Sequence, residues 1–216
     1  MKGVRDLVDD ETTVVSADLD VHSGLEHLLT EEEMARARRF HRRIHRDRYV
    51  AARGLLRLLL AERLDADPTS IRIITEEHGK PRLDDEASLG FNLAHSGGDV
   101  LYAFTATGDV GVDIERVRPI DPVGLSRTCF SEVEREQLLD LDASKRLDAF
   151  FHGWARKEAV IKADGRGMSL ELDSFSVSLA GAARLVEPPP GDDAARWSLT
   201  SLDAGPAVRA AFAVRS

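Results

Sequence analysis

The stretch FFHGWARKEAVIKADGRG, residues 150–167, predicts the long helix around which the rest of the chain is arranged. No proline interrupts it, and Gly165 and Gly167 mark its end, because glycine commonly terminates helices. Residues four positions apart share one helix face, so Glu158 and Lys162 lie together on a single stripe. Taken alone, this stripe predicts a solvated ion-pair ladder, the common role of such charges.

A second acidic pattern, GVDIE at residues 111–115, changes this interpretation. In a β-strand alternate side chains point to opposite sides, so Asp113 and Glu115 lie together on the face opposite the apolar residues that enter the core. Two carboxylates on a strand and a third, Glu158, on the helix are the oxygen ligands that magnesium prefers. Water and a substrate phosphate would complete the shell of such an ion.

The composition describes an ordinary globular protein of 216 residues, with 43% apolar and 31% charged residues. This length suffices for one large domain or two small ones. The single cysteine, Cys129, excludes an internal disulfide and a cysteine-rich zinc site, and it fits a reducing cytosol. No apolar run is long enough to span a membrane, and the acidic N-terminus does not resemble a signal peptide. We therefore expect a cytoplasmic protein without membrane association.

A net charge of −9 argues against general nucleic-acid binding. The charge is unevenly spread, however, because residues 36–57 contain nine arginines and one acid, Asp47. A basic segment in an acidic protein favours a local anion site. For most of the nine arginines a solvated helix face remains the alternative.

Two capping boxes, which begin at Thr30 and Ser131, stand 101 residues apart. Each opens a short helix, followed by a long helix and then a strand. The repeated order predicts an α+β fold of two similar α/β subdomains, residues 1–107 and 108–216, related by a pseudo-two-fold axis. We expect the active site in the cleft between them, since ligand sites favour such interfaces. Two prolines predict a loop at residues 119–122.

Four short motifs follow one another along the chain: GKP at 79–81, FNLAHSG at 91–97, GVDIE at 111–115 and WARKEAVIK at 154–162. Each motif alone is weak, and their combined order and spacing carry the argument. In this combination the chain resembles the Sfp-type 4′-phosphopantetheinyl transferases over roughly residues 39–179.

The resemblance implies an enzyme that moves the 4′-phosphopantetheine arm of coenzyme A onto a serine of an apo acyl or peptidyl carrier protein. It implies magnesium as cofactor, 3′,5′-ADP as the released product, and a monomer. The carrier would belong to fatty acid, polyketide or nonribosomal peptide synthesis. Residues 113, 115 and 158 become the metal carboxylates, in agreement with the geometric interpretation. Glu158, Lys162 and Asp113 become the catalytic residues, with Glu158 as base, directly or through a metal-bound water.

The resemblance also assigns the binding of coenzyme A and of the carrier. Lys162 would contact the pyrophosphate, and Lys80, Arg48, Arg53 and His95 the adenosine end with its 3′-phosphate. Carrier contacts are expected at Phe130, Met168 and Leu170, unless these residues belong to the core. The full set expected to bind coenzyme A is Arg48, Arg53, His78, Gly79, Lys80, Pro81, Ala94, His95, Asp113, Glu158 and Lys162.

Two positions depart from the family pattern. Ala94 stands where the family often has serine, so a hydroxyl donor to the 3′-phosphate is missing. Glu33 stands where some members have lysine, and a carboxylate cannot bind phosphate. The 3′-phosphate must therefore rely on arginines of residues 36–57, and the sequence does not say which.

Two other classes of protein compete with a transferase. The first is a non-catalytic paralogue that binds coenzyme A or a nucleotide, although such a protein has no reason to retain Asp113, Glu115, Glu158 and Lys162 together. The second is a nuclease or another metal-dependent phosphohydrolase. That class leaves the GKP motif and the loop of His95 unexplained.

Overall fold

The computed structural model describes residues 5–8, 12–84 and 89–216. Its first half contains β1 (Arg5–Val8), β2 (Thr12–Asp18), α1 (Glu31–Arg38), α2 (Arg43–Leu64), β3 (Ile73–Thr75), β4 (Pro81–Leu83), β5 (Gly90–Ser96) and β6 (Asp99–Thr105). Its second half contains β7 (Asp109–Arg116), α3 (Pro122–Cys129), α4 (Glu132–Asp140), α5 (Ala143–Asp164), β8 (Ser176–Val177), β9 (Leu185–Glu187), β10 (Trp197–Leu202) and β11 (Val208–Arg215).

The two halves repeat one order of elements: a strand, a short helix, a helix of 22 residues, two short strands and two longer strands. Strand β1 and helix α3 are additions to this common order. Both short helices begin with a complete capping box, at Thr30 with Glu33 and at Ser131 with Glu134. The strand orders β2-β6-β5 and β7-β11-β10 also correspond. The prediction of an α+β fold with two similar subdomains is therefore confirmed.

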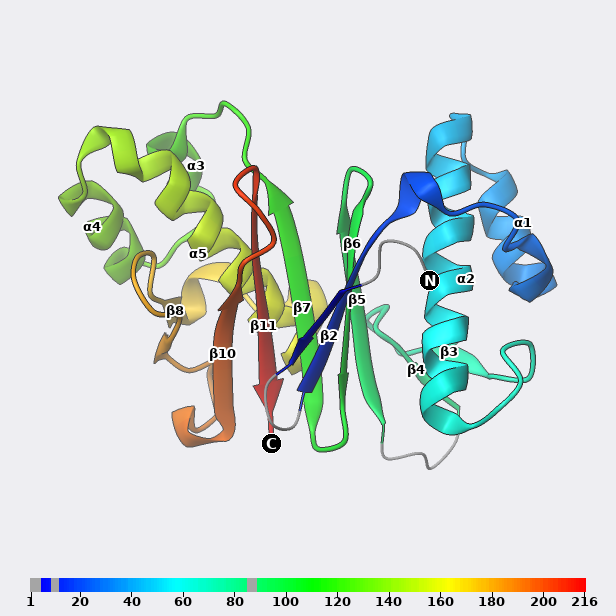
Figure 1. Ribbon diagram of the computed structural model, residues 1–216. Helices are drawn as coiled ribbons and strands as arrows, with labels where there is room; N and C mark the ends of the chain where they lie inside the picture. Colours follow the sequence, from blue (N-terminus) through cyan, green and yellow to red (C-terminus); the bar gives the residue numbers. More distant parts are fainter. Residues whose placement is uncertain (1–4, 9–11, 85–88) are drawn as a thin grey trace.

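The strands form two antiparallel sheets that pack against each other between the two long helices (Figure 1). Helix α2 covers the outer face of the sheet β1-β2-β6-β5 through leucines such as Leu55 and Leu59. Helix α5 covers the sheet β10-β11-β7 through Ala159 and Ala163. The inner faces share one apolar cluster: Val14, Ala94, Leu101, Ala103, Val110, Val112, Ile114, Val208, Ala210 and Phe212.

The two sheets meet along a seam between β5 and β7. Side-chain hydrogen bonds, rather than a ladder of backbone hydrogen bonds, hold this seam together. The Asn92 side-chain oxygen, in a buried residue, accepts a hydrogen bond from the backbone N–H of Val112 at 3.0 Å. Four residues further along both strands, the Ser96 hydroxyl accepts from the backbone N–H of Arg116 at 3.1 Å. Both bonds join residues 20 positions apart. The seam therefore has one register, in which β5 and β7 run in the same direction.

Strand β7 packs unusually closely on helix α5 at Gly111. A Cβ atom there would lie 2.1 Å from the backbone oxygen of Ala159 and 2.3 Å from the backbone nitrogen of Ala163. Only glycine fits such a backbone approach. On the same face of the strand, Asp113 and Glu115 point toward α5, while Val112 and Ile114 enter the inter-sheet cluster. The predicted alternation of this strand is confirmed.

Two sequence expectations are wrong and a third is incomplete. The predicted loop at 119–122 ends at Asp121, because Pro122 opens α3 with Asp121 as its N-cap. Proline suits the first helical position, where its missing N–H is not needed. Phe130 and Leu170, at 0% and 4% exposure, are core residues and do not form a docking surface. Met168 is fully exposed, as a carrier contact would require.

No helix within the described residues combines the length and apolarity needed to cross a membrane.

Replacing Asn92 with alanine should lower the free energy of unfolding by about 1–3 kcal/mol, because the buried Val112 N–H loses its acceptor. The matched control is Ser96→Ala at the exposed end of the same seam, where water can replace the hydroxyl, with an expected loss of about 0.5–1.5 kcal/mol. Urea denaturation followed by circular dichroism measures both. Equal losses would contradict the role assigned to Asn92.

Candidate active site

Asp113 and Lys162 form the closest charge pair of the site, between β7 and α5. The Lys162 ammonium donates to Asp113 Oδ1 at 2.6 Å and to the backbone oxygen of Val112 at 3.2 Å. Asp113 is 5% exposed, and its Oδ2 atom is buried without a hydrogen-bond partner among the described residues. Burial raises the pKa of Asp113, and the Lys162 charge offsets only part of this effect. One oxygen of a buried carboxylate is thus left without compensation.

Glu158 and Glu115 lie beside this pair. Burial raises the pKa of Glu158, and the negative charges of Asp113 and Glu115 raise it further, whereas Lys162 lowers it. The Glu115 carboxylate accepts a hydrogen bond from the Trp154 indole nitrogen at 3.1 Å. The structure therefore brings the three predicted carboxylates close enough to interact. It also gives Trp154, from the same helix as Glu158, a polar contact with Glu115.

The three carboxylates form a candidate site for a divalent cation. Across the residues that the structure describes, no three His, Cys, Asp or Glu side chains are already arranged around a common metal position. The chemistry nevertheless fits: three carboxylates repel one another, two of them have raised pKa values, and Asp113 Oδ2 has no partner. A hard cation that takes oxygen ligands would relieve all three features.

The first half contributes His95 and Arg48 to the same region. Partial desolvation of the ring lowers the pKa of His95, and the charges of Lys162, Arg48 and His45 lower it further. Arg48 donates two hydrogen bonds, both 2.7 Å, to the Asp20 carboxylate. His95 therefore lies within electrostatic reach of groups from both halves. Arg48 already forms an ion pair with Asp20, so a substrate phosphate would have to share Arg48 with this carboxylate or displace it.

The GKP loop crosses from the first half to the second. The Lys80 ammonium donates to Asp109 Oδ1 at 3.0 Å and to the backbone oxygen of Ala163, near the end of α5, at 3.2 Å. Gly79 has a φ of 90°, in the region that favours glycine. The Ala94 side chain, in contrast, is buried between the sheets, because it alternates with His95 along β5. Only the backbone of Ala94 is left to contact a ligand.

Glu33 organises two of the arginines instead of opposing a phosphate. Its carboxylate caps α1 and forms ion pairs with Arg53 and Arg57, both at 2.9 Å. Burial acts to raise the pKa of Glu33, but the bonds from Arg57 and Thr30 and the charge of Arg53 hold it below its usual range. Arg57 is itself buried and also donates to the backbone oxygens of residues 68 and 71. Arg57 is therefore a structural residue.

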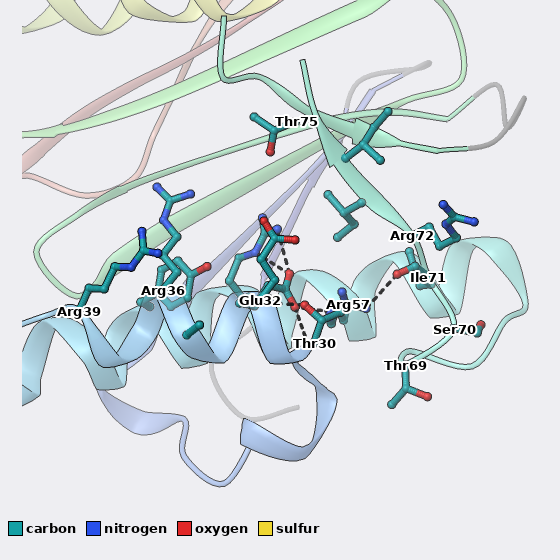
Figure 2. A pocket seen from close by; sticks show the side chains of 16 residues that line it. Thr30, Glu32, Arg36, Arg39, Arg57, Thr69, Ser70, Ile71, Arg72 and Thr75 are labelled. Atoms are coloured by element: carbon teal, nitrogen blue, oxygen red, sulfur yellow. Dashed lines mark hydrogen bonds and ion pairs between the residues drawn. The ribbon is translucent and has the colours of Figure 1, made fainter. Parts of the chain in front are cut away.

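A pocket of about 730 Å³ lies beside these arginines, between α1, α2 and β3 (Figure 2). Six of the nine arginines of residues 36–57 form ion pairs, whereas Arg36, Arg39 and Arg42 form none within the described parts of the chain. Of these three, Arg36 and Arg39 line the pocket. Figure 2 shows both at the same end of the pocket. Arg36 also lies over the Tyr49 ring, 5.7 Å from its centre. The sequence indicated an anion site here but could not identify its free cations.

Lys157, which precedes Glu158 in the motif, does not reach the site. Its ammonium is completely buried and donates to both oxygens of Glu134, at 2.8 and 2.7 Å, and to the backbone oxygen of Phe175 at 2.7 Å. Glu134 also completes the capping box of α4 and accepts from the backbone N–H of Val177. This ion pair fixes α4 and β8 on the face of α5 away from the carboxylates. The capping box was visible in the sequence, but its buried partner was not.

Comparison with known proteins assigns the family. The chain matches the family model of the 4′-phosphopantetheinyl transferase superfamily over residues 109–213 and that of a 4′-phosphopantetheinyl transferase N-terminal domain over residues 20–107. It is 36% identical over 151 residues to the 4′-phosphopantetheinyl transferase Sfp of Bacillus subtilis, which covers 70% of this chain and 66% of that protein.

Two further relatives are the 4′-phosphopantetheinyl transferases HetI of a Nostoc species and AcpT of Escherichia coli, both 36% identical. The matches cover 81% and 56% of this chain, and 73% and 58% of those proteins. The matched region thus spans just under two thirds of the Bacillus protein and nearly three quarters of HetI. The chain belongs to the 4′-phosphopantetheinyl transferase superfamily.

Replacing Lys157 with methionine should lower the free energy of unfolding by about 3–5 kcal/mol, because the Glu134 carboxylate remains buried without its cation. Adding Glu134→Gln should recover about 0.5–3 kcal/mol, since glutamine keeps the capping bonds without the charge. Lys145→Met, which breaks the exposed pair with Asp142, is the control and should cost less than about 1 kcal/mol. A double variant no more stable than Lys157→Met would contradict this account.

His95 should titrate below about 6.5, the usual value for histidine, because desolvation and neighbouring cations disfavour its charged form. At pH 6.5 less than half of His95 should therefore carry a proton. A histidine NMR titration measures this, and the signal missing from His95→Gln assigns the resonance. A midpoint at or above 6.5 would show that the cations of both halves do not act on this ring.

Proposed function

We propose that this chain transfers the 4′-phosphopantetheine group of coenzyme A to a serine of an apo acyl or peptidyl carrier protein. The observation that carries the proposal is the meeting of Asp113, Glu158 and Lys162 with His95 across the seam of the two halves. Membership of the family supports the reaction. The carrier would serve fatty acid, polyketide or nonribosomal peptide synthesis, and the chain would act as a cytoplasmic monomer.

Coenzyme A would lie across the seam with its adenosine end toward the first half. The loop at 78–81 and His95 would contact that end, in line with the reach of Lys80 between the halves. Arg48 and Arg53 are the predicted partners of the 3′-phosphate, but both already bind acids. The unpaired cations of the pocket in Figure 2, Arg36 and Arg39, are therefore additional candidates.

Asp113, Glu115 and Glu158 would hold a magnesium ion, which when bound supplies positive charge to the diphosphate of coenzyme A. Lys162 adds a fixed cation beside the same carboxylates. Phosphoryl transfer depends mainly on such positioning and charge neutralisation. The protein therefore contributes orientation and charge and needs no covalent intermediate.

The carrier serine would attack the phosphorus next to the pantetheine arm. A new bond joins the serine oxygen to this phosphorus, and the bond to the leaving 3′,5′-ADP breaks. The serine hydroxyl loses its proton to the Glu158 carboxylate. The raised pKa of Glu158, caused by burial and by the charge of Asp113, suits a general base at neutral pH.

A non-catalytic protein that binds coenzyme A is the second candidate. The observation in its favour is that no three potential metal ligands are yet arranged around one position in the described residues. Titration of coenzyme A with and without magnesium, followed by addition of an apo carrier, separates the two functions. A mass gain on the carrier supports transfer, whereas binding without a mass gain supports the alternative.

Glu158→Gln and Asp113→Asn should each reduce transfer by about 10²–10⁴-fold or more, through loss of the base or of a metal carboxylate. The readout is the mass gain of an apo carrier, and circular dichroism checks that the fold is intact. The matched control is Glu136→Gln, which removes an exposed carboxylate of α4 and should leave the rate unchanged. Normal turnover by either site variant would refute the mechanism.

A further inference from the structure

Asp113 uses its two carboxylate oxygens unequally. Oδ1 accepts a 2.6 Å hydrogen bond from Lys162, whereas Oδ2 is buried and unpartnered within the described chain. The residue is 5% exposed, so water contributes little to its compensation. A buried carboxylate needs a cation or several donors to remain ionised. In this structure the Lys162 ammonium is the cation that meets that need.

Lys162 is held less firmly than Asp113. Its second bond, to the backbone oxygen of Val112, is 3.2 Å long, and its side chain is 27% exposed. It projects from α5 one turn beyond Glu158, and its charge acts on both Glu158 and His95. The flexible side chain can therefore leave Asp113 without any change in the backbone. What prevents it from leaving is the negative charge of the carboxylates.

We propose that Lys162 is the resident counter-ion of Asp113, which competes with a divalent cation for this carboxylate until the diphosphate of coenzyme A draws the ammonium away. This inference rests on the proposed function and adds to it the order in which coenzyme A and the divalent cation bind. The divalent cation binds weakly to the free protein and tightly to the protein that already holds coenzyme A. Lys162 is the residue through which one ligand affects the other.

The argument is one of thermodynamic linkage. The ammonium lies on Asp113 Oδ1, so a divalent cation that binds the same carboxylate, at the unpartnered Oδ2 or in place of the ammonium on Oδ1, is repelled by it. A ligand that displaces the ammonium must therefore raise the affinity for the cation, and the cation must raise the affinity for that ligand by the same factor. Without the ammonium, the free protein should therefore bind the cation more tightly than the wild-type protein does.

The test is a calorimetric titration of Mn²⁺ into wild type and Lys162→Met, in the absence of coenzyme A and with it at saturation. Without coenzyme A, Lys162→Met should bind Mn²⁺ about 5–150-fold more tightly than wild type. With coenzyme A bound, the two affinities should converge. Lys80→Met is the matched control, because this neighbouring ammonium lies on Asp109, and its Mn²⁺ affinity without coenzyme A should equal that of wild type.

Equal Mn²⁺ affinities of wild type and Lys162→Met without coenzyme A would overturn the proposal. A difference of the same size in the presence of coenzyme A would also overturn it, since Lys162 would then act only as a nearby charge. Lys162→Gln provides a second variant if the methionine variant does not fold. Carrier modification by the wild-type protein is measured separately. A mass gain on the carrier together with equal Mn²⁺ affinities would contradict this inference alone. The absence of both Mn²⁺ binding and a mass gain would contradict the proposed function.

Discussion

The hydrogen bond from the backbone N–H of Val112 to the Asn92 side chain joins the two halves of the molecule. The next residue is Asp113, the carboxylate that pairs with Lys162 in the candidate site. The seam has no ladder to set its register, so the side chains of Asn92 and Ser96 take the place of backbone acceptors. A shift by one residue would exchange the faces of β7 and turn Asp113 away from α5. The alignment of His95 with the carboxylates depends on this register.

The second constraint is electrostatic. The charges of the two halves are arranged differently. Most arginines of α1 and α2 are matched by acids, whereas the three carboxylates of the site are matched by Lys162 and by a 3.4 Å contact from Arg118 to Glu115. Matched charges hold the first half in shape, as Glu33 does for Arg53 and Arg57. The site carboxylates of the second half are only partly neutralised, so binding a cation there can still lower the free energy. Stability and binding are thus assigned to different groups of ionised residues.

Much of this could be predicted from the sequence, because the relevant signals are local. The alternation of residues 111–115, the two capping boxes and the glycines after α5 each follow from neighbouring residues and match the structure. The helix at α3 was missed, since proline is also common in turns and only the N-cap bond of Asp121 distinguishes the two cases. The site residues were named by pattern and family resemblance.

What the sequence could not provide are the long-range partners. Lys157 and Glu158 are adjacent in the chain, yet one is neutralised in the core by Glu134 and the other faces the carboxylates. The nine arginines look alike in sequence, and only nearby acids in the folded chain separate the paired ones from Arg36, Arg39 and Arg42. Such assignments depend on contacts between residues tens of positions apart, which no local periodicity encodes.

The 22-residue helices α2 and α5 occupy corresponding places in the repeated order of elements, and yet one is rich in arginine and the other carries Glu158 and Lys162. Both helices pack apolar residues onto their sheets, so the framework can persist while the remaining positions of each helix vary. Duplication of one frame frees each copy to specialise in ligands of opposite sign. A chain built in this way carries an arginine-rich helix and an anionic site on one repeated framework.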